Sequence, residues 1–152
     1  GVVNNAAYGD YAPLLVVDTE RMAALLAKYG LGAMMVCREC ARDFMENGGG
    51  TILNVGSTAA HKGYAGGTPY ASSKFALSAM TECWRAELRP LDIRVMQIDP
   101  SEVQTPFGGR DMSTLNPTKL VSTDIAHMFK AMLEMDDRGF VTNAMVWATN
   151  PK

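Results

Sequence analysis

Apolar runs alternate along this chain with segments in which apolar residues recur at helical spacing. Residues 51–55, 93–98 and 140–148 are mostly apolar and rich in β-branched side chains, which is typical of strands covered on both faces. Residues 1–3 run into a polar Asn-Asn pair and predict the end of one more buried strand. We therefore expect about four strands.

Helices are predicted between these strands. Apolar positions recur at helical spacing from residue 20 to about 47, from 69 to 90 and from 123 to 133. Gly30 and Gly32 interrupt the first of these helices. Each costs about 1 kcal/mol relative to alanine inside a helix, which indicates either close packing against a neighbour or a local bend.

Three helix starts can be located from the sequence. Asp18 or Thr19 is expected to cap the first helix. Thr68 is expected to cap the second, because Pro69 is favoured at the first helical position, where no amide hydrogen is needed. Thr123 is expected to cap the last helix.

The order of strands and helices predicts the fold class. A helix followed by a buried strand is the rhythm of doubly wound proteins. We therefore expect an α/β fold with a partial doubly wound, Rossmann-like parallel sheet of about four strands with flanking helices. At 152 residues the chain has the size of one domain, so residues 1–152 are treated as a single unit.

Composition narrows the classes of partner and location. A hydrophobic content of 47% with 20% charged residues is ordinary for a soluble globular protein. The net charge of −2, without a basic stripe, argues against nucleic acid and against an anionic membrane surface. No apolar run approaches the roughly 18 residues that span a bilayer, and the N-terminus lacks the features of a signal peptide. These features predict a cytoplasmic protein.

The chain has three cysteines and no secretory features, which favours reduced thiols over disulfides. Cys37 and Cys40 form a CxxC pair inside a predicted helix, without a second pair to complete a zinc site. Helix packing is therefore the favoured interpretation. A metal or redox module is the less favoured one, and no metal site is expected.

Residues 50–74 carry the candidate chemistry. Ser57 follows a predicted strand at its carboxyl end, where open α/β sheets bind ligands. Tyr70 and Lys74 are four residues apart and share one helical face. An ammonium beside a phenol stabilises the phenolate and lowers its pKa, so Tyr70 is a candidate proton donor, and the Ser57 hydroxyl could bind a substrate carbonyl. From spacing alone, a half-buried tyrosine, a solvated lysine and a turn serine remain the alternative.

Four motifs that follow one another along the chain favour the catalytic interpretation over this alternative. They are NNAA from Asn4, ILNVGS ending at Ser57, YASSK from Tyr70 to Lys74 and DPSEVQT from Asp99 to Thr105. Together they resemble the short-chain dehydrogenase/reductase family, over the C-terminal part of that family's domain. The resemblance implies that Tyr70 is the general acid/base, that Lys74 lowers its pKa and holds the nicotinamide ribose, and that Ser57 positions the substrate carbonyl.

The resemblance also implies a cofactor, a substrate class and an assembly. The cofactor would be NAD or NADP, and the substrate a small secondary alcohol or ketone, with a 3-oxoacyl thioester as one candidate. Family members commonly pair the two long helices into a homodimer or homotetramer, for which Phe44, Met45, Met80 and Trp84 offer apolar side chains. The matching cofactor-binding positions are Asn4, Asn5, Ala6, Tyr70, Lys74, Pro100, Ser101, Val103 through its backbone and Thr105 through its hydroxyl.

The absence of one motif of the family keeps an alternative open. No GxGxxG fingerprint occurs near the start, so the N-terminal unit that holds a dinucleotide pyrophosphate is expected to be missing. Tyr29 stands where we align the family's catalytic asparagine. The alternative is a non-catalytic truncated fragment or assembly module that keeps the site residues, and we expect weak binding of NADH and NADPH by these 152 residues alone.

Overall fold

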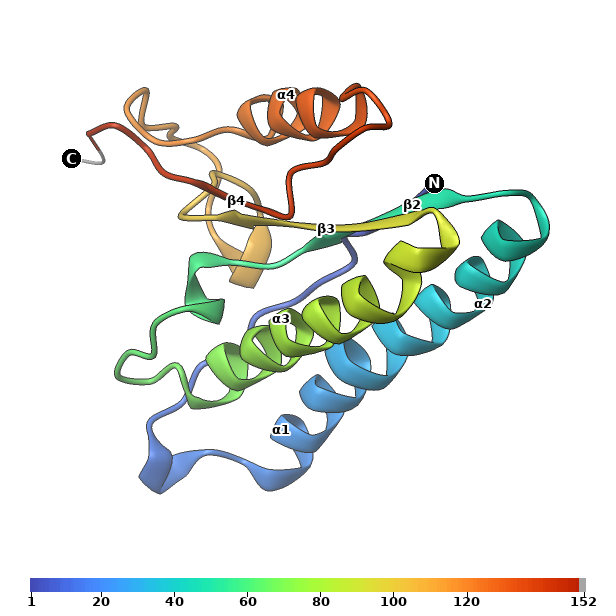
Figure 1. The fold of residues 1–152 in the computed structure, drawn as a ribbon. Coiled ribbons are helices and arrows are strands. Elements are labelled where there is room, and N and C mark those ends of the chain that lie inside the picture. Colours follow the sequence, from blue (N-terminus) through green and yellow to red (C-terminus); the bar gives the residue numbers. More distant parts are fainter. Residues whose placement is uncertain (151–152) are drawn as a thin grey trace.

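The structure, a computed structural model, describes residues 1–150 and contains one parallel sheet (Figure 1). Its four strands are hydrogen-bonded in sequence order, which confirms the predicted parallel α/β sheet. The strands are β1 (Val2–Asn4), β2 (Gly50–Val55), β3 (Ile93–Pro100) and β4 (Asn143–Val146). The predicted last strand, 140–148, is thus longer than the observed one.

Helices cover both faces of the sheet. Figure 1 shows α1 (Thr19–Leu26), α2 (Ala33–Glu46) and α3 (Thr68–Leu88) on one face, and α4 (Ser122–Leu133) on the other. Short 3₁₀ helices lie between these elements at residues 14–16, 58–60, 89–91 and 107–109. Because both faces are covered, the central strands carry apolar residues at successive positions.

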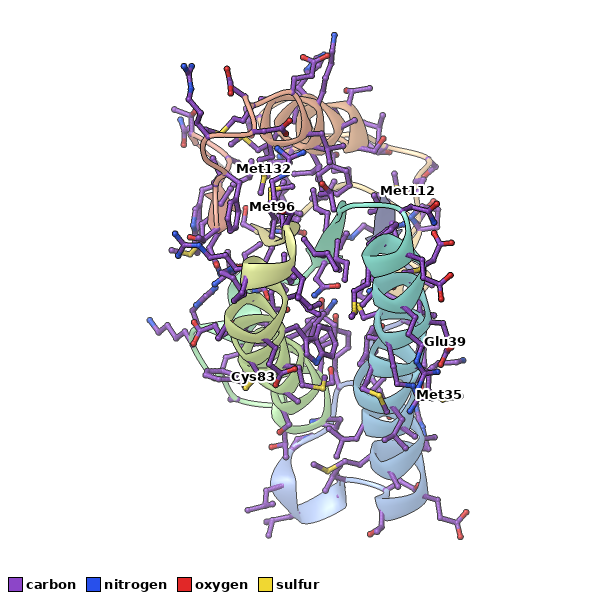
Figure 2. The ribbon with its side chains drawn as sticks, turned by 45° about the vertical axis from the view of Figure 1, so that its right-hand side comes forward. Met35, Glu39, Cys83, Met96, Met112 and Met132 are labelled. Carbon is purple, nitrogen blue, oxygen red and sulfur yellow. The ribbon has the colours of Figure 1, made fainter. Side chains whose placement is uncertain are left out.

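Successive residues of β2 and β3 feed two separate cores. Ile52 and Val95 belong to the core beneath α2 and α3, together with Cys37 of α2. Met96 belongs to the core beneath α4, where Figure 2 shows it close to Met132. Neighbouring side chains of a strand point to opposite faces, so this division follows from the strand period of two.

A buried polar network ties the first two strands to the helices. Asn54 of β2 is fully buried and donates through Nδ2 to Thr81 Oγ1 at 2.8 Å. Its Oδ1 accepts from Nδ2 of Asn4 at 2.8 Å. The Asn4 amide also contacts the Cys37 sulfur at 2.9 Å, and burial raises the pKa of that thiol to about 11. These partners make Cys37 part of the packing of the fold.

The long helix predicted from residue 20 contains a π-helical segment at Ala27–Gly32, which joins α1 to α2. A Cβ atom added at Gly30 would meet nothing within 4 Å, and the nearest atom at Gly32 would be the Ala27 carbonyl oxygen at 3.9 Å. Close packing therefore does not explain the two glycines. The two glycines lie instead in a segment of a different helix type. The expected local bend stays a prediction.

The helix starts agree only in part with the sequence. Asp18 caps α1, because its carboxylate accepts from the Arg21 amide at 2.7 Å. The predicted caps Thr68 and Thr123 are wrong, since both residues already lie inside their helices. Gly67 precedes α3 without a side-chain cap, and Val121 precedes α4, where its amide donates to Asp124 at 2.8 Å.

Candidate active site

An open cleft of about 1190 Å³ lies along the carboxyl edge of the sheet. Parallel strands bring their carboxyl ends to one edge, where loops can surround a ligand. All three predicted catalytic residues, Ser57, Tyr70 and Lys74, line this cleft. Ser57 comes from the loop after β2, and the other two come from the first turns of α3.

Tyr70 is 9% exposed and lies between two other aromatic rings. Its ring centroid is 5.4 Å from that of Tyr11 and 5.8 Å from that of Phe107. Burial raises the pKa of Tyr70 to about 12, although hydrogen bonding with the Ser57 side chain acts in the lowering direction. The sequence predicted a lowered pKa. Burial dominates here, and the phenol is held in its protonated form.

Lys74 is a buried cation, with 2% of its surface exposed. Its Nζ donates to the Val55 carbonyl at 3.0 Å and lies 4.8 Å from the ring centroid of Tyr29. The distance to the Tyr70 centroid is 5.7 Å. Burial lowers the pKa of Lys74 to about 8, with the charge of Asp99 acting in the opposite direction. Part of the population therefore loses its charge in mildly alkaline solution.

Tyr29 contacts Lys74 through its ring rather than its hydroxyl. The side chain is buried, and its hydroxyl hydrogen-bonds the backbone amide and carbonyl of Tyr8. Burial raises the pKa of this phenol. The π face of a tyrosine attracts a cation, so the ring stabilises the ammonium at the position where the family pattern has an amide.

Ser57 is held by its backbone as well as its side chain. Its amide donates to Asp99 Oδ1 at 2.9 Å, and its Oγ accepts from the Ala59 amide at 3.1 Å. The side chain thereby caps the 3₁₀ helix at Thr58–Ala60. The preceding Gly56 allows Asp99 to approach, because a Cβ atom there would lie 2.0 Å from Asp99 Oδ1.

Gly56→Ala is therefore expected to lower the free energy of unfolding by about 1–3 kcal/mol, the usual effect of an added methyl group in a packed interior. Urea unfolding followed by circular dichroism would measure this. Gly63→Ala is the matched control, since a Cβ atom at Gly63 meets nothing within 4 Å. Equal stability of the two variants would contradict the close approach of Asp99 to Gly56.

The residues predicted to bind a nicotinamide cofactor fall into two groups. The Asn4 side chain lies in the polar network beneath the sheet, away from the cleft. The others line the cleft with Tyr70 and Lys74, and they are Asn5, Ala6, Pro100, Ser101, Val103 and Thr105. Lys74 has three N–H donors and, within residues 1–150, hydrogen-bonds one acceptor. Its two remaining donors fit a hydroxyl-bearing group such as a ribose.

Several cleft residues carried no local signal in the sequence. Tyr11, Phe107 and Trp147 come from segments far apart in the chain, and each lines the cleft. His61 also lines it, next to Asp99. An aromatic residue in a predicted loop is the only clue that could have pointed to Tyr11 or Phe107, and that clue is weak. Within the described residues, no group of three or more His, Cys, Asp or Glu side chains could hold a metal ion, and no helix could cross a membrane.

Known proteins with similar sequences are dehydrogenases and reductases. A family model described as short chain dehydrogenase matches residues 1–116. The chain is 42% identical over 77 residues to the NADP-dependent 3-hydroxy acid dehydrogenase of Schizosaccharomyces pombe, which covers 51% of this chain and 30% of that protein. It is 34% identical over 108 residues to L-xylulose reductase of Bos taurus, which covers 70% of this chain and 44% of the reductase. The chain thus spans less than half of these relatives.

The fold is shared with solved structures of low sequence identity. An alcohol dehydrogenase from the archaeon Thermococcus sibiricus, complexed with 5-hydroxy-NADP, superimposes with a TM-score of 0.88 at 22% identity. The match covers 99% of this chain and 64% of that one. A serine dehydrogenase complexed with NADP⁺ gives a TM-score of 0.86 at 23% identity, over 95% of this chain and 62% of the other.

Proposed function

This chain belongs to the short chain dehydrogenase family, and we therefore propose that it supplies the catalytic part of an NAD(P)-dependent oxidoreductase that interconverts a secondary alcohol and a ketone. The observation that carries the proposal is the meeting of Ser57, Tyr70 and Lys74 in one cleft at the carboxyl edge of the sheet. A serine, a phenol and a buried ammonium suffice to orient a carbonyl, to supply a proton and to hold a ribose.

Each residue has a distinct part in the proposed reaction. The nicotinamide, when bound, supplies or accepts the hydride. Tyr70 donates its phenolic proton to the carbonyl oxygen in reduction and takes it back in oxidation. Ser57 donates a hydrogen bond to the same oxygen and orients it. Lys74 holds the ribose hydroxyls and places positive charge near the phenol, which stabilises the phenolate left after proton transfer.

The substrate is proposed at the level of its class. The named relatives act on a 3-hydroxy acid and on L-xylulose, both of which are small molecules with an alcohol or a carbonyl group. The rings of Tyr11 and Phe107 lie beside Tyr70 in the cleft, so the substrate contacts apolar as well as polar side chains there. A 3-oxoacyl thioester stays a candidate substrate of the same chemistry.

The proposal is tested by following absorbance of NADH and NADPH with a panel of ketones, aldehydes and 3-oxo acids. We expect oxidation of one of the two cofactors that depends on the carbonyl substrate. Assays should use both the 152-residue chain and any longer natural form of the protein. A longer form that binds NADPH or NADH but turns over no member of the panel would contradict an oxidoreductase role.

The alternative is that residues 1–152 keep the site residues without binding a dinucleotide by themselves. This alternative is supported by the limited coverage of the relatives. The matches span 30% of the 3-hydroxy acid dehydrogenase and 44% of L-xylulose reductase. Calorimetric titration of the 152-residue chain with NADPH and NADH distinguishes the two. We expect no saturation by either cofactor in the micromolar range for these 152 residues alone, and micromolar saturation would contradict the alternative.

We also propose that the protein forms a homodimer or homotetramer through its long helices. The helices on this face of the sheet expose several apolar residues to solvent. They are Leu31, Met35, Val36, Met45 and Phe75, each at least 45% exposed. Figure 2 shows Met35 on the side of α2 that faces away from α3. Of the side chains suggested from the sequence, Phe44 and Trp84 pack against the core instead, which leaves Met45 as the most exposed.

Light scattering after size exclusion is expected to give a mass above the 16.4 kDa of one chain. Val36→Glu should shift the protein toward the monomer, because paired carboxylates in an apolar interface are strongly unfavourable. Leu115→Glu, at a loop residue that is 55% exposed, is the control and should not change the mass. A well-folded monomer at micromolar concentration would contradict the proposed assembly.

A further inference from the structure

Asp99 is a fully buried carboxylate at the carboxyl end of β3. Its Oδ1 accepts from the Ser57 amide at 2.9 Å, and Gln97 Nε2 lies 2.8 Å and 3.0 Å from the two carboxylate oxygens. The Oδ2 atom lies 2.8 Å from Nε2 of His61. Because a buried carboxylate requires hydrogen-bond partners, these contacts fix its orientation.

His61 is held by this carboxylate but is not itself buried. Its side chain is 37% exposed, and it lines the same cleft as Tyr70. The His61 amide donates to the Thr58 carbonyl at 3.1 Å, so the short 3₁₀ helix after Ser57 places its backbone. Asp99 is the one hydrogen-bond partner of the His61 ring among residues 1–150. The second ring nitrogen, Nδ1, is left for a ligand.

The hydrogen bond to the Asp99 carboxylate also determines whether His61 Nδ1 acts as an acceptor or as a donor. A neutral ring bonded to Asp99 through Nε2–H presents Nδ1 as an acceptor, whereas a protonated ring presents Nδ1–H as a donor. A hydroxyl group matches both forms, since it can donate to one and accept from the other. A carboxylate matches only the protonated ring, and an ammonium group only the neutral one.

We infer that His61 is a specificity-determining residue that binds a second hydroxyl of the substrate, close to the reacting carbonyl, and that Asp99 is its positioning residue. The substrate class is therefore a hydroxy ketone and its diol product rather than a simple ketone. The inference rests on the proposed function, because it places the hydroxyl beside a carbonyl bound at Ser57. One carboxylate accepts from the Ser57 amide and contacts the His61 ring, so it links the positions of the two binding residues.

The test compares hydroxyacetone with butanone, which has a methyl group in place of the hydroxyl, and with pyruvate, which has a carboxylate. With reduced nicotinamide cofactor, kcat/KM for hydroxyacetone is expected to exceed that for butanone by about threefold to tenfold, the net contribution of one hydrogen bond. His61→Phe should bring the ratio close to one by lowering only the hydroxyacetone value. His61→Gln, which keeps a donor and an acceptor, should restore part of the ratio.

His127→Gln is the matched control, since His127 is exposed on α4 and does not line the cleft. This variant should keep the wild-type ratio. Equal kcat/KM for hydroxyacetone and butanone in the wild type, or a ratio that survives in His61→Phe, would overturn the inference. A His61-dependent preference for pyruvate would also overturn it, because the group bound would then be a carboxylate. If a form of the protein that binds the cofactor reduces none of the three compounds, the proposed function is contradicted, and the binding measurement below tests the inference separately.

Binding is measured by nitrogen NMR of protein labelled in its histidines. The sequence contains two histidines, so His127→Gln leaves only the His61 signal. Hydroxyacetone should shift the Nδ1 resonance of His61, and butanone at the same concentration should not. Asp99→Asn should change the tautomer of His61, because an amide can donate to Nε2 whereas a carboxylate cannot. An Nδ1 signal that hydroxyacetone leaves unchanged would refute the inference without any assay of turnover.

Discussion

Tyr70→Phe is expected to lower kcat by about 10²–10⁴-fold, the usual contribution of a positioned proton donor. The substitution removes one oxygen and keeps the ring, so the contacts of Tyr70 with Tyr11 and Phe107 should persist. The affinity for the cofactor should change little, because Lys74 and the loop after β3 are untouched. Steady-state kinetics together with cofactor titration would measure both effects.

Tyr8→Phe provides the matched control. Tyr8 is half-buried and its ring lies 6.0 Å from that of Tyr29, but it does not line the cleft. Its loss of a hydroxyl should leave kcat within about twofold of wild type, in keeping with a substitution away from the chemistry. If Tyr70→Phe retained near-normal turnover, Tyr70 would not be the proton donor.

The local parts of this site could be predicted from sequence because they depend on short-range periodicity. Tyr70 and Lys74 are one helical turn apart, and a proline near the start of α3 marks where that turn begins. Ser57 follows a mostly apolar run, which indicates a buried strand and its carboxyl end. The same reasoning predicted the four parallel strands, since strands covered on both faces need helices between them.

The environment of these residues could not be predicted in the same way. Tyr11 and Phe107 reach Tyr70 from segments 59 residues before it and 37 residues after it, and no local pattern encodes those contacts. They matter because the burial of the phenol, to which they contribute, reverses the expected direction of its pKa shift. The contact between Tyr29 and Lys74 is of the same kind. It depends on how a π-helical segment packs against α3, whereas the sequence alone indicated only a residue type that departs from the family pattern.

Replacing Lys74 with methionine is expected to stabilise the fold at neutral pH while it abolishes activity. Lys74 is 2% exposed, and burial lowers its pKa from 10.5 to about 8. That difference corresponds to about 3 kcal/mol of unfavourable free energy for keeping the charge inside the folded protein. Methionine has a similar length and no charge, but it forfeits the hydrogen bond to the Val55 carbonyl. We therefore expect a net gain of about 1–3 kcal/mol at pH 7.

The pH dependence of this gain identifies its cause. Between pH 8 and 10.5 the unfolded chain keeps the Lys74 proton while the folded chain has released it, so the wild-type protein becomes more stable relative to Lys74→Met as the pH rises. Below pH 8 both states are protonated and the full difference persists. Guanidinium unfolding of both proteins at pH 7 and pH 10 would show the difference shrinking. Lys130→Met, at a side chain that is 71% exposed, should show almost no effect at either pH. A Lys74→Met variant less stable than wild type at pH 7 would mean that the ammonium contributes more through its contacts with Val55 and Tyr29 than its burial costs.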